Sequence, residues 1–295
     1  MNAFVYHQLQ NVNRLLDRWM EKRAGEVRLP GNIQIEEDIP YLADREACHR
    51  MDIYRPAGAT APLPVIVNLH GGGMLLCTKT VNRPFCCELA KRGFLVFCLE
   101  YPLVPQSDIP GILRDVARGM DKVADLLEYY GGDPERVYLV GDSAGAFISV
   151  YEAAAQKNRD LSAAIPVRPS GLKIRALGLI SGMYYTTLAD TVGFWLRKDF
   201  YGKRWRHHPM APYYKPHKPN VAKHLPPCFL VTSKSDNLHG YTIRFHKGLV
   251  KAGIPCTLLD HGLLKNLQHD FVIVKPESGD AQNAIDRMVA FLLKQ

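Results

Sequence analysis

Val137-Tyr-Leu-Val140, followed by Gly141-Asp142-Ser143-Ala144-Gly145, decides the interpretation of this chain of 295 residues. The apolar run predicts a buried strand, and residues 144–155 predict a helix. Between a strand and a helix, the GxSxG pattern places its serine on a sharp, strained turn, and the glycines let strand and helix approach closely. The start of a helix also stabilises negative charge. We therefore interpret Ser143 as a nucleophile and the N–H of Ala144 as a donor to the oxyanion that its attack creates.

A second glycine-rich turn, His70-Gly71-Gly72-Gly73, follows the apolar run 64–69. Consecutive glycines cost conformational entropy, and a loop whose backbone N–H groups face a ligand explains that cost. Its position upstream of the serine motif predicts that the N–H groups of Gly71 and Gly72 complete the oxyanion hole. We interpret His70 as a residue that shapes this loop by hydrogen bonding, not as the catalytic base.

A serine nucleophile needs a base, and the base needs an acid that orients it. After a GxSxG turn the acid comes first along the chain and the histidine second. Asp236 follows the strand-like run 228–232, and His269 lies on the loop after the run 256–260. We therefore expect both at the edge of the sheet that carries Ser143. An unperturbed histidine titrates near pH 6.5, so activity is expected to fall below about pH 6–7.

Four other residues compete for the roles of base and acid. His261 ends a predicted strand and is an alternative base, whereas His239 is a weaker one because it lies close in sequence to the acid loop. Asp260 and Glu100 also end predicted strands and are alternative acids.

Short apolar runs alternate with helical patterns from residue 27 onward. Strands are expected at 32–37, 48–55, 64–69, 94–100, 137–140, 174–180, 228–232 and 256–260, and helices at about 80–91, 110–130, 144–157, 240–252 and 278–293. Several runs are almost continuously apolar, as in strands that are buried on both faces of a parallel sheet. We expect an α/β fold with a mainly parallel sheet of eight strands and helices on both faces.

Two segments break this alternation. Residues 3–23 predict an amphipathic helix, and residues 183–226 are rich in aromatic, proline and basic residues. We assign residues 1–25 and 183–226 to a helical cap over the carboxyl edge of the sheet, where ligands bind in open α/β sheets. Residues 26–182 and 227–295 then form the core. Candidates for substrate-binding residues in the cap are Trp195, Trp205 and Tyr213.

The positive charge of the chain is concentrated in one segment. Residues 190–224 contain eight Lys and Arg but two acids, within a chain whose net charge is +8. This segment is either a solvated surface or a region that attracts an anionic substrate. No nucleic-acid-binding motif accompanies it, so we expect no nucleic-acid partner. His207 and His208 lack the HExxH spacing and acidic neighbours, so we expect no metal.

The seven cysteines are scattered without CxxC spacing. This pattern indicates reduced thiols in a cytoplasmic protein. No apolar run reaches the roughly 18 residues that a membrane-spanning helix needs, and no secretory signal is visible at the N-terminus. We therefore expect a protein without an integral membrane segment, and the sequence leaves a homodimer open.

Together, the HGGG loop, the GDSAG turn and the order Ser143, Asp236, His269 resemble the hormone-sensitive-lipase-like branch of the α/β-hydrolase superfamily, which includes the bacterial family IV carboxylesterases. The resemblance runs from Met51-Asp-Ile-Tyr-Arg-Pro56 through His269 and includes Leu225-Pro226-Pro227. It implies an α/β-hydrolase fold and a serine carboxylesterase that hydrolyses short- to medium-chain esters through an acyl-enzyme. It also implies a small ester as the substrate and no cofactor.

Three alternatives remain open at this stage. Amidases or peptidases, and also acyltransferases, use the same triad and differ in the pocket or in the acceptor. A non-catalytic ligand-binding protein can share the fold, but such proteins typically lose the triad histidine, and His269 is present.

Overall fold

The computed structural model describes residues 7, 8, 11, 15, 18, 31–60, 62–263 and 266–295. Within these ranges, eight strands form one sheet: β1 (Ile33–Pro40), β2 (Arg50–Pro56), β3 (Leu63–Leu69), β4 (Leu95–Leu99), β5 (Gly132–Asp142), β6 (Ile174–Ile180), β7 (Cys228–Ser233) and β8 (Cys256–His261). Each overlaps a predicted run, so the expected strands are confirmed.

Helices occupy most of the connections between the strands. The longer ones are α2 (Arg83–Lys91), α3 (Ile109–Tyr130), α4 (Ala144–Ala155), α5 (Arg159–Ala164), α6 (Thr191–Tyr201), α8 (His239–Lys251) and α10 (Gly279–Leu292). The short ones are η1 (Lys79–Asn82), η2 (Trp205–His207), η3 (Ala211–Tyr213), α7 (Pro219–Ala222) and α9 (Phe271–Val274). The five predicted helices correspond to α2, α3, α4, α8 and α10. Ser278 caps α10 by accepting a hydrogen bond from the N–H of Ala281.

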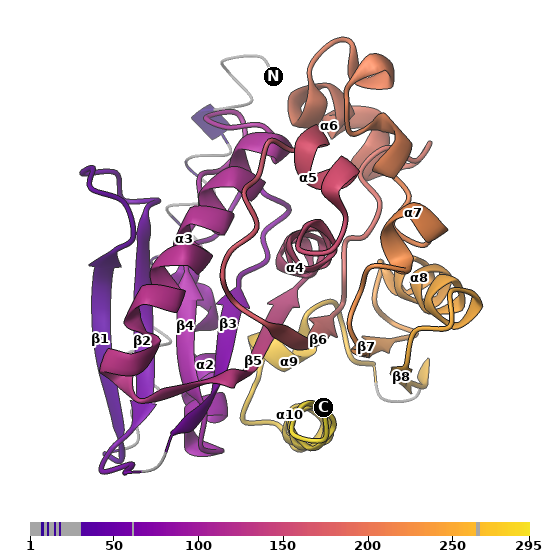
Figure 1. The fold of residues 1–295 in the computed structure, drawn as a ribbon. Helices are drawn as coiled ribbons and strands as arrows, with labels where there is room; N and C mark the ends of the chain where they lie inside the picture. Colours follow the sequence, from indigo (N-terminus) through magenta and orange to yellow (C-terminus); the bar gives the residue numbers. More distant parts are fainter. Residues whose placement is uncertain are drawn as a thin grey trace.

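The strand order is β1-β2-β4-β3-β5-β6-β7-β8, as Figure 1 shows. β2 runs antiparallel to both of its neighbours, β1 and β4, whereas the strands from β4 to β8 are parallel. The loops that follow β3, β5, β7 and β8 therefore leave the sheet at the same edge, which is where ligands bind in sheets of this type.

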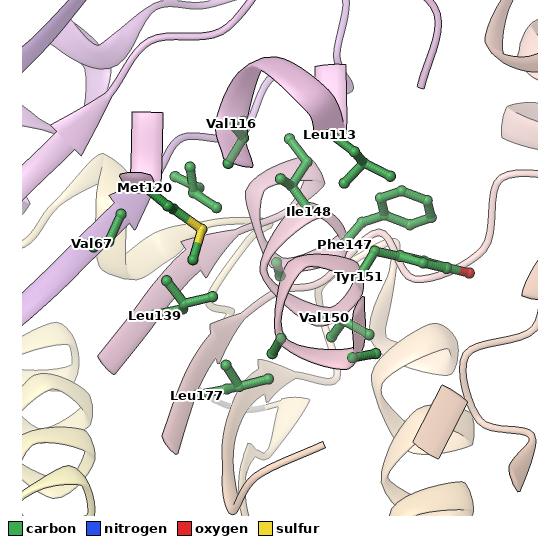
Figure 2. Packing of buried hydrophobic residues seen from close by; sticks show 14 of the residues in the cluster. Val67, Leu113, Val116, Met120, Leu139, Phe147, Ile148, Val150, Tyr151 and Leu177 are labelled. Carbon is green, nitrogen blue, oxygen red and sulfur yellow. The ribbon is translucent and has the colours of Figure 1, made fainter. Parts of the chain in front are cut away.

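Helices cover both faces of the sheet, which confirms the expected α/β architecture (Figure 1). Helices α3, α4 and α8 bury their apolar residues in one core, and α2 and α10 bury theirs in another. Successive side chains of β3 alternate between the two cores, because neighbouring residues of a strand point to opposite faces. Val65 and Val67 belong to the first core and Ile66 to the second. Figure 2 shows Phe147 and Ile148 of α4 within the first core.

Residues 181–227, between β6 and β7, include α6, η2, η3 and α7. Helix α6 contacts α3, and α7 contacts α4 and α8. This segment covers the predicted cap insertion, and its role as a cap stays a prediction. The predicted N-terminal helix falls largely outside the described residues, although residues 7, 8, 11, 15 and 18 are helical. Among the described residues, no helix combines the length and the apolar character that crossing a membrane requires.

Candidate active site

The turn between β5 and α4 holds Ser143 in a strained backbone conformation, with φ 46° and ψ −110°. Two backbone hydrogen bonds fix this turn: the N–H of Ser143 donates to Ile180 O at 2.9 Å, and Ser143 O accepts from the N–H of Met183 at 2.9 Å. A Cβ on Gly145 would lie 1.9 Å from the carbonyl oxygen of Leu69. Position 145 therefore requires glycine, as the sequence motif predicts.

The structure brings Ser143, His269 and Asp236 together from three different loops. His269 Nε2 lies 3.0 Å from Ser143 Oγ, and His269 Nδ1 lies 2.8 Å from Asp236 Oδ1. The same Asp236 oxygen accepts a hydrogen bond from the N–H of Leu238 at 2.7 Å. Burial alone would raise the pKa of Asp236, but the bond to His269 outweighs it, and the pKa is lowered. Asp236 is therefore a carboxylate that can orient and stabilise an imidazolium.

The glycine-rich loop after β3 lies directly against this serine. A Cβ on Gly71 would lie 3.1 Å from Ser143 Cβ and 2.3 Å from Asp142 Oδ2. Gly72 has a φ of +98°, where side chains are disfavoured, and a Cβ there would lie 2.0 Å from Leu76 O. Ala144 is buried as the first residue of α4. The three proposed oxyanion donors thus belong to two segments that meet at Ser143.

This combination of strand order, serine turn and glycine-rich loop agrees with a comparison against protein families. The family described as the α/β-hydrolase fold matches residues 66–273. The chain is an α/β hydrolase. It belongs to the hormone-sensitive-lipase-like branch, as the motifs indicate.

Among curated proteins, this hydrolase is similar to a probable isoprenylcysteine α-carbonyl methylesterase of Arabidopsis thaliana, with 32% identity over 136 residues that cover 46% of this chain and 29% of that protein. It is also similar to the esterase LipI of Mycobacterium tuberculosis, with 26% identity over 230 residues that cover 76% and 71% of the two chains. The match to the plant methylesterases spans between 26% and 39% of their own length.

Among solved structures, esterase B from Lactobacillus rhamnosis aligns with a TM-score of 0.88 at 19% identity, covering 97% of this chain and 93% of the other. A bacterial heroin esterase aligns with a TM-score of 0.74 at 21% identity, covering 97% and 92%. At this level of identity, the two likenesses establish the fold.

The alternative bases and acids of this hydrolase lie elsewhere. His261 packs edge-on against Phe271, with ring centroids 5.3 Å apart. His239 Nε2 contacts both carboxylate oxygens of Asp260 at 3.1 Å. The fourth competitor, Glu100, is hydrogen-bonded to His70. Within the described ranges, the side-chain hydrogen bonds of His239, Asp260 and Glu100 go to groups other than the side chains of Ser143, Asp236 and His269.

His70 shapes the glycine-rich loop, as the sequence predicts. Its Nε2 lies 2.8 Å from Glu100 Oε1 and its Nδ1 lies 2.8 Å from Gly71 O. Its ring stacks on Tyr101 at a centroid distance of 4.2 Å, and the Tyr101 hydroxyl donates to His70 O at 2.6 Å. Burial alone would lower the pKa of His70, but the negative charge of Glu100 outweighs it, and the pKa is raised. A buried ion pair therefore holds the loop beside Ser143.

Glu100 also connects this loop to the first two strands of the sheet. Its Oε2 accepts a hydrogen bond from the backbone N–H of Lys79 at 2.9 Å. The Lys79 ammonium contacts Asp38 in β1 and Asp52 in β2, each at 2.9 Å. Burial alone would lower the pKa of Lys79, but the charge of Asp52 and the hydrogen bonds to the two carboxylates outweigh it, and the pKa is raised. Opposite charges therefore alternate from β1 to the loop at Ser143.

Asp270 is a residue of the site that the sequence analysis missed. Its Oδ2 lies 3.1 Å from His269 Nε2, and its backbone N–H donates to Ser181 Oγ at 3.3 Å. Burial alone would lower the pKa of His269, but the hydrogen bonds to Asp236 and Asp270 outweigh it and raise the pKa to about 10. The expectation that activity falls below about pH 6–7 does not fit this environment. An acid directly after the candidate base was the signal in the sequence.

We expect Asp270→Asn to extend activity toward lower pH. Removing a negative charge destabilises the imidazolium, so the pKa of His269 falls and the neutral base persists at lower pH. The acid limb of kcat/KM should move down by roughly 1 pH unit or more relative to the unmodified protein. Asp160→Asn, an exposed change in α5, is the control. Identical acid limbs in the two variants would contradict the role of Asp270.

The three candidate substrate-binding residues have different surroundings. The guanidinium groups of Arg197 and Arg206 lie over the Trp205 ring, at 4.8 and 4.4 Å from its centroid. The carbonyl oxygen of Tyr213 accepts a hydrogen bond from the Tyr151 hydroxyl at 2.6 Å, which ties the segment to α4. Trp195 belongs to α6, and its side chain lies outside the described part of the chain. Binding of substrate by these residues stays a prediction.

Proposed function

We propose that this α/β hydrolase is a serine carboxylesterase that hydrolyses short- to medium-chain carboxylic esters through an acyl-enzyme intermediate. The observation that carries the proposal is the chain of contacts at Ser143: its Oγ lies 3.0 Å from His269 Nε2, and His269 Nδ1 lies 2.8 Å from Asp236. These distances lie within hydrogen-bond reach, which proton transfer from a serine to a histidine requires.

In the proposed reaction, Ser143 Oγ attacks the ester carbonyl while His269 Nε2 accepts the hydroxyl proton. Negative charge then develops on the carbonyl oxygen, and the N–H groups of Gly71, Gly72 and Ala144 stabilise it. His269 returns the proton to the leaving alcohol, and the acyl group remains on Ser143. Water, deprotonated by His269, attacks this acyl group and releases the carboxylic acid.

The electrostatics of the site stabilise the imidazolium that these proton transfers create. Asp236 fixes the orientation of the His269 ring and stabilises the imidazolium that forms during attack. Asp270 adds a second carboxyl group on the Nε2 side of that ring, at 3.1 Å. Burial, reinforced by the charge of Asp270, raises the pKa of Asp142 to about 7. Asp236 and Asp270 therefore favour the protonated ring, so the neutral ring that accepts the hydroxyl proton is expected at higher pH than for a free histidine.

The preference for short to medium acyl chains rests on the segment between β6 and β7, which we propose to act with residues 1–25 as a cap. Its aromatic side chains suit an apolar acyl group. The names of two similar proteins agree with ester hydrolysis: LipI is called an esterase, and the plant relative is called a probable methylesterase. The region shared with this chain makes up 29% of the plant protein.

A panel of p-nitrophenyl esters tests the chain-length proposal. We expect kcat/KM to be highest for acyl groups of about two to eight carbons and at least roughly tenfold lower for palmitate, because the proposed cap would leave no room for the surplus methylenes. Matched anilides in parallel test amidase activity, and an added alcohol tests acyl transfer through the ester product. Equal rates for butyrate and palmitate would contradict the proposed preference.

We also propose that the hydrolase acts in the cytoplasm. All seven cysteines lie in the described ranges and are free thiols there. Unpaired cysteines in this number suit a reducing compartment.

A further inference from the structure

A basic groove lies between α7 and α8. Its volume is about 940 Å³, and none of Ser143, Asp236 and His269 lines it. The short segment around α7 forms one wall, and one face of α8 forms the other. Figure 1 shows these two helices side by side. Its five permanently charged residues are Lys218, Lys223, Arg244, Lys247 and Lys251.

These five cations lack neutralising partners in the described part of the chain. None of them forms an ion pair there, whereas many other cations of the chain do, such as Lys79, Arg83 and Arg92. The one carboxylate bonded to a lining residue is Asp260, which contacts His239 at 3.1 Å. Five cations without an ion-pair partner among the described residues therefore face one such carboxylate in the groove.

The charges of the groove also act on His217, which lines it. Burial lowers that pKa, and the charges of Arg244, Lys218 and Lys215 lower it further, to about 4. The imidazole is therefore neutral at physiological pH. Its Nδ1 lies 3.0 Å from the hydroxyl of Tyr185, which fixes the ring in the wall.

The groove is also built rigidly enough to present its charges in one place. A Cβ on Gly248 would lie 2.4 Å from His217 Cβ, so the wall around His217 packs directly on the backbone of α8. The Arg244 guanidinium lies 5.1 Å from the centroid of the Tyr185 ring, a cation–π contact that restrains it. On the same helix, Lys247 and Lys251 follow Arg244 at spacings of three and four residues, which places all three on one face.

We propose that this groove binds a soluble polyanion that carries two or more phosphate groups, at a site separate from the triad. Arg244 to Lys251 span about 10 Å along the helix at 1.5 Å per residue, which is longer than a single phosphate. Lysines act as point charges toward phosphate and match a flexible chain of phosphates. The volume of the groove lies in the usual range for sites of small molecules.

The proposal also accounts for part of the basic segment 190–224. Lys218 and Lys223 belong to that segment, and the structure places them opposite α8 in the groove. Attraction of an anion was one of the two interpretations of that segment. For Lys218 and Lys223, the anion would therefore bind in the groove and not at the triad.

Inorganic tripolyphosphate serves as the probe, titrated calorimetrically into the full chain at low and at physiological salt. We expect saturable binding that weakens as salt rises, because ions screen exposed charges. The double variant Lys218→Gln/Lys247→Gln should lose at least about tenfold in affinity. The control Lys275→Gln/Lys294→Gln removes the same charge from exposed positions outside the groove and should bind within about twofold of the unmodified protein.

Equal losses in the two double variants would overturn the proposal, because binding would then follow the net charge of the protein. Vesicles of phosphatidylcholine with and without a bisphosphorylated phosphoinositide separate a soluble ligand from a lipid headgroup. Groove-dependent capture by the phosphoinositide vesicles, without saturable binding of tripolyphosphate, would contradict a soluble ligand. Circular dichroism verifies that each variant is folded. Both assays measure binding, so their results do not depend on esterase activity.

Discussion

Ser143→Ala should lower kcat for p-nitrophenyl butyrate by about 10⁴–10⁶, because the members of a catalytic triad act as a unit. The fold should persist. The substitution removes the hydroxyl that contacts His269, and alanine keeps the Cβ that the strained turn already accommodates. Rates of ester hydrolysis and thermal unfolding curves of the two proteins check the chemistry and the fold separately.

Covalent labelling distinguishes loss of the nucleophile from a general defect. An organophosphonate should label the protein without substitutions once, at Ser143, and should leave the Ser143→Ala variant unlabelled. Ser149→Ala is the matched control, because Ser149 lies on the same helix and its hydroxyl donates to Gly145 O at 2.9 Å. Inactivation with the label on another residue, or a near-normal rate for Ser143→Ala, would show that another group attacks the ester.

His269→Ala should reduce kcat by a similar factor of roughly 10⁴–10⁶, whereas His261→Ala should retain most of it. Both histidines lie near the carboxyl end of β8, but it is the His269 ring that lies within hydrogen-bond distance of Ser143 and Asp236. His261 instead packs against Phe271. Steady-state kinetics of the two variants at several pH values test the assignment.

The pair of histidine variants also separates stability from catalysis. His261 is buried, so its replacement should lower the temperature of unfolding more than it lowers kcat. The proposed base is wrong if His261→Ala is folded and inactive while His269→Ala retains its rate.

The strands were predictable because burial on both faces leaves a distinctive trace in the sequence. β3 and β4 are apolar along almost their whole length, so no alternation or helical period competes with the strand interpretation. The short elements η2, η3 and α7 were not predictable. They are held by contacts to distant residues, such as the hydrogen bond from the Tyr151 hydroxyl to Tyr213 O, and their local sequence carries no period.

The candidate triad was predictable from chain order, because parallel strands deliver their following loops to one edge. Asp270 was not recognised, since an acid beside a histidine is common in turns. Its effect on the pKa of His269 depends on a backbone turned to φ 54°, which brings the carboxylate back to Nε2. The basic groove depends on the packing of Gly248 against His217, two positions whose proximity no sequence period indicates.

The alternation of charges from β1 to the glycine-rich loop limits how this protein can be shortened. The family match begins at residue 66, which suggests a natural boundary for a minimal enzyme. A fragment cut there would lack Asp38 and Asp52 and would leave the Lys79 ammonium without its two carboxylates. The cut would also remove β2, which pairs with β4 from Met51 to Tyr54 and buries Met51 and Ile53 in the first core, so it would expose apolar surface of β4 to water. The smallest independently stable catalytic fragment must therefore keep β1 and β2.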